Sequence, residues 1–165
     1  MEIKPVGDDI YESNAKSFIA AMGELSKKQQ ERIDGAIRIA NEYKTKGAKF
    51  IVTDYDGIAG VVGLMILTEC KEEKNFKIED ICTHPCTKGV GRKLVEHAVN
   101  ISCANGYMGN LKITDMSSSS FYNNLGFKSE DDSIKKILEP AKSLSVILCN
   151  CQCIKGDRSG GHRTR

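Results

Sequence analysis

Long apolar runs are missing from this chain of 165 residues. The longest, such as residues 58–67, are interrupted by glycine and are far shorter than the roughly 20 residues that a membrane-spanning helix needs. The first residues also lack the charged stretch followed by an apolar stretch that typifies a secretory signal peptide. We therefore expect no membrane partner and a cytoplasmic location.

A regular cysteine framework is missing as well. The seven cysteines cannot all pair, and their scattered positions are unlike those of a small disulfide-rich secreted domain, so we expect reduced thiols. Cys149, Cys151 and Cys153 form a C-x-C-x-C sequence, but no second ligand pair with zinc-like spacing accompanies it. The sequence therefore predicts no metal. The Gly-Lys-Ser/Thr of a phosphate-loop nucleotidase and the full G-x-G-x-x-G dinucleotide fingerprint are absent too.

What the chain does contain is enough apolar residues, 40% of the total, for one domain with a core. The net charge is close to balance at +2, but positive charge is concentrated near residue 165. We divide the chain into a domain, residues 1–153, and a flexible basic tail, residues 154–165. No aromatic or helical pattern supports nucleic-acid binding by this tail, so nucleic acid is an unlikely partner. Its basic residues are Lys155, Arg158, Arg163 and Arg165.

The central feature of the sequence is a predicted strand that runs into a glycine-punctuated helix start. Residues 76–83 alternate with the period of two that is typical of a strand with two distinct faces. From Val90 onward the apolar residues follow helical spacing instead, up to a stop near Gly106. Gly89 and Gly91 lie in the turn between the two elements.

This turn has the composition of an anion-binding site. The first N–H groups of a helix have no partner within the helix, the helix dipole favours negative charge there, and glycine allows close approach to the backbone. Lys88 and Arg92 add positive charge. A tight strand-to-helix turn without a ligand is the alternative interpretation.

The rest of the chain predicts strands and helices around this feature. Asp56-Gly57 is a strong hairpin signal between two predicted strands. The other expected elements are strands over residues 1–6, 49–55, 58–67, 110–115, 134–138 and 144–149, and helices over residues 11–22, 33–43 and 117–125.

Four segments resemble, in order and spacing, the GNAT superfamily of acetyl-coenzyme A dependent N-acetyltransferases. They are residues 78–81 (IEDI), 84–85 (HP), 89–94 (GVGRKL) and 121–127 (FYNNLGF). The resemblance implies an α/β (α+β) single domain with a mixed, mostly antiparallel sheet flanked by helices. One departure is Cys86, which stands at the head of the turn, where family members usually carry Gln or Arg.

The resemblance also implies a binding site for acetyl-coenzyme A (acetyl-CoA), here used as a cosubstrate. Main-chain groups of the strand would pair with the pantetheine, and the turn would hold the diphosphate. The residues concerned are Ile81, Cys82, Thr83, Lys88, Gly89, Val90, Gly91 and Arg92.

Two side chains match positions that donate or accept a proton in the reaction of family members. The phenol of Tyr122 would protonate the thiolate as it leaves, although a tyrosine on a short helix can also be simple core. Glu79 would take the amine proton, often through water, although it can also be an exposed strand residue. Asp80 points to the other face, so only one of these two carboxylates can line the acceptor site.

The activity implied is direct transfer of an acetyl group from acetyl-CoA to a primary amine. The IEDI strand favours a small-molecule amine over a protein lysine or N-terminus, and the acceptor partner is otherwise unknown. A non-catalytic module that keeps the fold to sense acyl-CoA or to bind a partner is the alternative, motivated by the turn with Cys86. A homodimer is left open.

Overall fold

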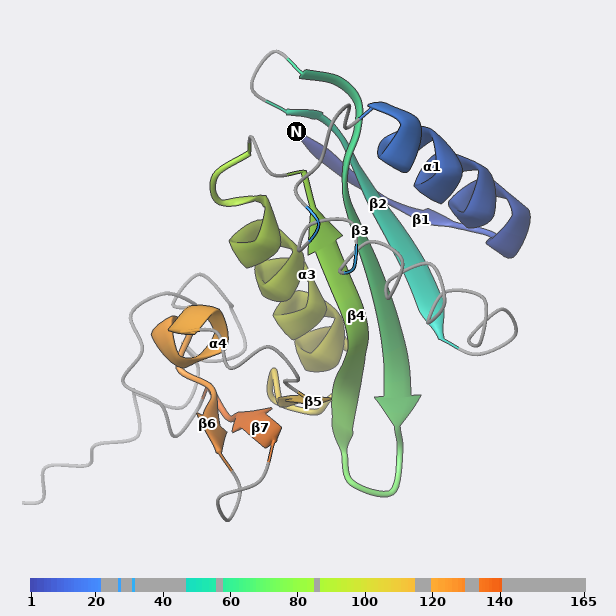
Figure 1. Cartoon of the computed structure of the whole chain (residues 1–165). Coiled ribbons are helices and arrows are strands. Elements are labelled where there is room, and N and C mark those ends of the chain that lie inside the picture. The colour runs from blue at the N-terminus through green and yellow to red at the C-terminus, as the bar shows by residue number, and fades with distance from the viewer. Residues whose placement is uncertain are drawn as a thin grey trace, which may run out of the picture. The chain divides into compact units, whose positions relative to one another are not determined.

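The computed structural model describes residues 1–21, 27, 31, 47–55, 58–84, 87–114, 120–129 and 134–140 (Figure 1). The helices are α1 (Asp8–Ala21), α3 (Val90–Ala104) and α4 (Ser120–Asn124). The strands are β1 (Glu2–Val6), β2 (Ala48–Tyr55), β3 (Ile58–Cys70), β4 (Asn75–Thr83), β5 (Leu111–Thr114), β6 (Lys128–Ser129) and β7 (Lys135–Leu138).

Seven strands form the sheet, in the hydrogen-bonding order β1-β2-β3-β4-β5-β7-β6. The pairs β1–β2, β2–β3, β5–β7 and β6–β7 are antiparallel. The expected fold class, a mixed and mostly antiparallel sheet with helices, is therefore confirmed. The proposed boundary between residues 153 and 154 lies outside the described residues and stays a prediction.

The chain forms two compact units. The first consists of Met1–Glu69 and Ile78–Val95, and the second of Cys70–Lys77 and Glu96–Arg165. Strand β4 and helix α3 each have residues in both units. The segment that contains the predicted anion site, from Ile78 of β4 through the turn to Val95 of α3, lies entirely in the first unit.

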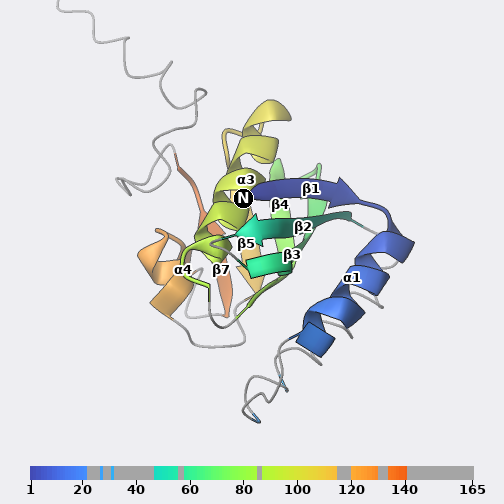
Figure 2. The ribbon, with the colours of Figure 1, turned by 90° about the horizontal axis from the view of Figure 1, so that it is seen from above.

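In the first unit, the helix α1 covers one face of the β1–β3 strands (Figures 1 and 2). Tyr11, Ala15 and Phe18 of α1 form one buried cluster with Ile51 of β2 and with Leu64 and Ile66 of β3. These α1 residues recur every three or four positions, which is the spacing that places apolar side chains on one helix face.

The start of α3 packs on the opposite face of these strands, as Figure 2 shows from above. Gly63 of β3 lies directly beneath Val90 and Leu94 of α3, with Val52 of β2 beside it. Ile51 and Val52 are neighbours in the strand and therefore face opposite sides, which agrees with one helix on each side.

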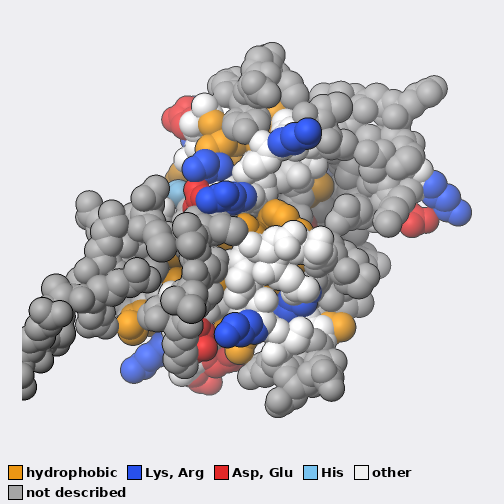
Figure 3. Space-filling view, turned by 90° about the vertical axis from the view of Figure 1, so that its left-hand side faces the viewer, with side chains coloured by type: hydrophobic (Ala, Val, Ile, Leu, Met, Phe, Trp, Pro, Cys, Tyr) orange, Lys and Arg blue, Asp and Glu red, His pale blue; other side chains and the backbone are white. Residues whose placement is uncertain are grey.

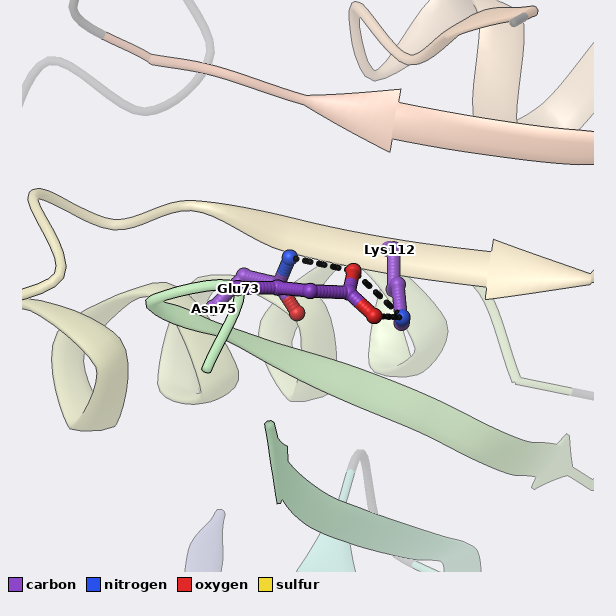
Figure 4. A network of polar contacts seen from close by, with 3 residues as sticks. All are labelled: Glu73, Asn75 and Lys112. Atoms are coloured by element: carbon purple, nitrogen blue, oxygen red, sulfur yellow. Dashed lines mark hydrogen bonds and ion pairs between the residues drawn. The ribbon is translucent and has the colours of Figure 1, made fainter. Parts of the chain in front are cut away.

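In the second unit, β7 pairs with both β5 and β6. The residues before β4 are tied to β5 by a polar network that Figure 4 shows from close by. Lys112 Nζ lies 2.5 and 2.6 Å from the two carboxylate oxygens of Glu73, and Asn75 Nδ2 donates to Glu73 Oε2 at 3.3 Å. The backbone N–H of Phe76 also donates to the carbonyl of Asn110.

Most predicted elements are present, with shifted ends. Strands β2 and β3 confirm the hairpin, since Tyr55 pairs with Ile58 across residues 56–57, which themselves are not described. The short helix α4 confirms residues 120–124 of the predicted helix over residues 117–125, of which residues 117–119 lie outside the described residues, and the two-residue strand β6 was not predicted. The predicted helix over residues 33–43 and the predicted strand over residues 144–149 lie outside the described residues.

Two other expectations have different outcomes. No helix among the described residues is long and apolar enough to cross a membrane. The expectation of reduced thiols is wrong for Cys103, which is disulfide-bonded, whereas Cys70 and Cys82 form no disulfide. The partner of Cys103 lies outside the described residues. A count of cysteines shows that not all can pair, but it carries no information on which two meet in space.

Candidate functional site

Strand β4 presents different residues to its two faces. Asp80 and Cys82 lie on the α1 face, because both act electrostatically on the buried Tyr11 and because Cys82 packs against the α1 cluster. Since neighbouring strand residues point to opposite sides, Glu79 and Ile81 point to the other face. The predicted alternation of this strand is thus present in the structure.

The chain turns sharply after β4. The backbone N–H of His84 donates to the carbonyl of Val62 at 2.9 Å, which ties this end of β4 to β3. Both the backbone N–H and the hydroxyl of Thr87 donate to the carbonyl of His84, at 3.0 and 2.7 Å. These bonds fix the distance between the strand end and the helix start, although residues 85–86 are not described.

Helix α3 begins at a glycine with a left-handed backbone. Gly89 has φ of 86°, a conformation that costs residues with a Cβ about 1–2 kcal/mol. Its carbonyl accepts the hydrogen bond from the N–H of Lys93 at 3.0 Å. The N–H groups of Val90 and Gly91 precede that first donor, so they have no acceptor within the helix.

Positive charge surrounds this helix start. Lys88, Arg92 and Lys93 are exposed, and the first turn of α3 contains no acidic residue. Lys and Arg side chains are visible on the face of the molecule drawn in Figure 3. Together with the helix dipole, these charges make the start of α3 favourable for an anion.

The packing of α3 explains why the turn is held in place. Its apolar residues lie on one buried face, and each exposes 1% of its surface or less: Val90, Leu94, Val95, Ala98 and Val99. Burial of one such side chain contributes about 1.5–3 kcal/mol. The helix therefore has one favourable orientation, with its polar side outward.

Asp80 is unusual for a strand residue on a covered face. Its Oδ2 atom is buried and has no hydrogen-bond partner among the residues that the structure describes. Burial raises the pKa of this carboxyl to about 6, and a hydrogen bond from the backbone N–H of Ile81 opposes this rise. A carboxyl without a counter-charge in apolar surroundings favours the neutral form.

Tyr11 is the α1 residue on which the charge of this carboxyl acts. It exposes only 2% of its surface. The pKa of its phenol is raised strongly, first by burial and then by the negative charges of Asp80 and Cys82. Phe18 lies in the same cluster and contacts the ring of His84 edge-on, with centroids 6.3 Å apart. The α1 face of β4 thus combines one acid with aromatic rings.

Tyr122 belongs to the second unit. It exposes 7% of its surface and packs edge-on against Phe121 and Phe127, with ring centroids 4.9 and 5.4 Å apart. The N–H of Phe127 donates to the carbonyl of Tyr122, and Gly126 with φ of 93° turns the chain after α4. The FYNNLGF segment therefore forms a short helix with a glycine stop, as its sequence predicts.

The predicted cofactor residues lie at the end of β4 and at the start of α3. Those on the strand, Ile81, Cys82 and Thr83, are half-buried, and Lys88, Gly89 and Arg92 around the helix start are exposed. Glu79 is half-buried on β4. The roles predicted for these side chains and for Tyr122 stay predictions.

One pair was not singled out from the sequence, namely Asp80 with Tyr11. A signal was present, because Asp80 shares its strand face with apolar Ile78 and Cys82. A charged residue on an apolar face is a departure from the expected pattern. The electrostatic influence of Asp80 on Tyr11 could not be read from the sequence, because α1 and β4 are far apart along the chain.

Comparison with known proteins identifies the fold. No protein-family model matches the sequence, and no curated protein matches it. Solved structures do match. An assigned acetyltransferase from Exiguobacterium sp. 255-15 superposes with a TM-score of 0.58 at 20% identity, over 84% of this chain and 92% of that one.

Two further structures agree. A protein from Desulfovibrio desulfuricans, assigned to the GNAT acetyltransferases, has a TM-score of 0.59 at 18% identity, over 84% of this chain and 98% of its own. AtaTR bound with acetyl-CoA has a TM-score of 0.57 at 16% identity, over 83% and 91% of the two chains. At these identities the likeness shows the fold, which is that of the GNAT acetyltransferases.

Proposed function

We propose that this chain, which has the GNAT fold, transfers an acetyl group from acetyl-CoA to a primary amine. The observation that carries the proposal is the start of α3. There a left-handed glycine, helix N–H groups without an acceptor in the helix and exposed basic side chains follow directly on β4.

These residues fit the anionic part of acetyl-CoA. Gly89 has no side chain to obstruct the backbone, and Lys88 and Arg92 offer charge to a diphosphate. The main-chain groups of Ile81, Cys82 and Thr83 would hold the pantetheine. Cys86, the departure from the family pattern, lies outside the described residues. When bound, acetyl-CoA supplies an activated thioester.

The proposed chemistry is direct acyl transfer. The amine gives a proton to the carboxylate of Glu79, and its nitrogen then bonds to the thioester carbonyl carbon. The carbon–sulfur bond breaks, and the departing thiolate takes a proton from the phenol of Tyr122. The products are an amide and coenzyme A. A backbone N–H of Ile81 or Cys82 would polarise the carbonyl as the negative charge develops.

The proposal also includes a class of acceptor. We favour a small-molecule amine over a protein lysine or N-terminus, because residues 78–81 (IEDI) of β4 resemble the strand of GNAT enzymes that acetylate small amines. A cytoplasmic location remains part of the proposal, and cell fractionation would test it. Among the described residues, no group of acidic, histidine or cysteine side chains could hold a metal ion. The mechanism invokes no metal.

Calorimetric titration of the full chain with acetyl-CoA tests the proposal most directly. Dephospho-coenzyme A and nicotinamide dinucleotide serve as comparison ligands. We expect selective binding of acetyl-CoA in the micromolar range. An amine screen that detects the released thiol should then find an acceptor.

A non-catalytic module that senses acyl-CoA is the competing function. It predicts binding of acetyl-CoA with no thiol release above the uncatalysed rate for any amine in the screen. Failure of the folded protein to bind acetyl-CoA would reject both functions.

A further inference from the structure

Thr87, in the turn between β4 and α3, is a polar residue that the proposed chemistry does not use. Its backbone N–H and its hydroxyl both donate to the carbonyl of His84, at 3.0 and 2.7 Å. The backbone bond spans three residues and closes a four-residue turn. The hydroxyl bond comes from the side chain and stabilises a turn that the backbone has already closed.

Both ends of this turn are attached to neighbouring residues of β3. The backbone N–H of His84 donates to the carbonyl of Val62 at 2.9 Å. Val90, the first residue of α3, packs on the backbone of Gly63. Val62 is fully buried, so this stretch of β3 belongs to the core. The sheet thus provides a fixed reference for the turn, and Thr87 lies between the two attachments.

The hydroxyl of Thr87 acts on the backbone. A hydroxyl has one proton to donate, and that of Thr87 is given to the carbonyl of His84, whose oxygen has two lone pairs for the two donors. The side chain is half-buried, and its branched Cβ restricts it to few rotamers. Thr87 is therefore suited to fix the path of the chain, not to bind a ligand itself.

The path of the chain matters because acetyl-CoA would bind on both sides of the turn. In the proposed function, main-chain groups at the end of β4 hold the pantetheine, and the N–H groups of Val90 and Gly91 hold the diphosphate. These two parts of acetyl-CoA are joined covalently, so the strand end and the helix start must lie at a matching distance. A displacement of about 1 Å is enough to weaken such a match.

We propose that Thr87 is a positioning residue for acetyl-CoA. Its hydroxyl, bound to the carbonyl of His84, keeps the start of α3 at the distance from β4 at which the pantetheine and the diphosphate bind together. The inference rests on the proposed acetyl transfer and adds a residue that touches no reacting atom. Loss of the hydroxyl should weaken a ligand that spans the turn more than a ligand that binds on one side of it.

Calorimetric titration of the full chain with acetyl-CoA tests the inference in Thr87→Val, which keeps the branched shape and the backbone bond but lacks the hydroxyl. We expect the Kd to rise about three- to tenfold, since one hydrogen bond contributes a factor of this size. Thr87→Ser keeps the hydroxyl and should bind within twofold of wild type. Thr114→Val, on the exposed end of β5, is the matched control and should do the same. An unchanged Kd in Thr87→Val overturns the inference.

Two fragments of acetyl-CoA give a readout that a merely structural role would not produce. Inorganic pyrophosphate stands for the diphosphate, and S-acetylpantetheine contains the thioester and the pantetheine. Amide NMR signals of the ¹⁵N-labelled full chain report the binding of each fragment. We expect Thr87→Val to leave both Kd values within twofold of wild type, because neither fragment spans the turn. Weakening of either fragment by the same factor as acetyl-CoA would show a general distortion of the site and overturn the positioning role.

The wild-type titration separates this inference from the proposed function. Acetyl-CoA binding that is equally strong in wild type and in Thr87→Val rejects the positioning role alone. A folded wild-type chain that does not bind acetyl-CoA rejects acetyl transfer, and the inference with it. If Thr87→Val fails to fold, Thr87→Ala removes the same hydroxyl with a smaller side chain and takes its place in each titration.

Discussion

Val90, the first residue of α3, packs so closely on Gly63 of β3 that a Cβ at position 63 would lie 2.8 Å from Val90 Cγ1. Leu94 and Val52 lie 3.3 Å from the same point. This contact places the start of α3, with its glycine and its open N–H groups, directly on the sheet. Because Gly63 has no side chain, α3 can pack this closely on β3. This packing holds the start of α3, and with it the proposed binding site, in position.

Gly63→Ala should consequently destabilise the protein by about 1–3 kcal/mol, because the added methyl overpacks the contact with α3. Urea unfolding measures this loss, and the affinity for acetyl-CoA should fall with it. Gly7→Ala is the matched control, since nothing lies within 4 Å of a Cβ at Gly7. The double variant with Val90→Ala should recover part of the stability. Strictly additive effects of the two changes would contradict the contact.

Tyr122→Phe tests the proposed proton donor. The ring still fills its place between Phe121 and Phe127, so folding should be unchanged, while loss of the phenolic proton should lower kcat by about 10²-fold. Tyr107→Phe is the control, since Tyr107 packs against Phe76 within the same unit. Thiol release from acetyl-CoA provides the measurement. A kcat equal to that of wild type would exclude Tyr122 as the donor.

Glu79→Gln tests the proposed base. We expect kcat to fall by about 10²-fold or more, because the amine proton loses its acceptor, while KM for the amine changes little. Asp80→Asn, which changes the adjacent carboxylate on the opposite strand face, is the control and should have a smaller effect on kcat. Steady-state rates at several amine concentrations separate kcat from KM. A kcat of Glu79→Gln equal to that of wild type would exclude Glu79 as the base.

The part of this fold that sequence could predict is the part built on local pattern. The alternation of residues 76–83 and the helical spacing after Val90 give β4 and α3 directly. Gly89 and Gly126 have positive φ where the predicted turn and helix stop require it. Periodicity and glycine position depend only on neighbouring residues, which explains their success.

The rest depended on contacts between distant segments. Asp80 was assigned to a strand face, but the helix on that face and its Tyr11 became known only from the structure. The short strand β6 has two exposed residues, so it lacks an apolar pattern of its own and exists through pairing with β7. The disulfide of Cys103 is a further long-range contact, which spacing alone does not reveal.

The ion pair of Glu73 with Lys112 predicts a small, salt-dependent contribution to stability. Hydrogen bonds from Lys112 and then from Asn75 lower the pKa of Glu73, so its contribution is present at neutral pH and is lost as pH falls through the lowered value. Glu73 is largely exposed, with 58% of its side chain accessible, so Glu73→Gln should cost at most about 1 kcal/mol at pH 7.

Thermal unfolding at pH 7 and pH 3, in low and high salt, measures this contribution. Glu72→Gln in the same turn serves as the control and should change stability by less. A cost for Glu73→Gln that is equally large at pH 3 and in high salt would contradict an electrostatic origin.

Asp80 should limit the stability of the folded chain at neutral pH. Because its pKa is raised from 3.8 to about 6, folding favours the protonated carboxyl. The stability associated with that proton is full below pH 4 and is lost as pH rises through about 6. A difference of this size corresponds to at most about 3 kcal/mol. Asparagine carries no charge at any of these pH values.

Asp80→Asn should therefore raise the unfolding free energy by about 1–3 kcal/mol at pH 8, and the gain should shrink as pH approaches 4. Urea unfolding of both proteins at four pH values measures it, with Asp9→Asn as the control. A gain that does not change with pH would assign the stabilisation to packing and would exclude the raised pKa of Asp80 as its cause.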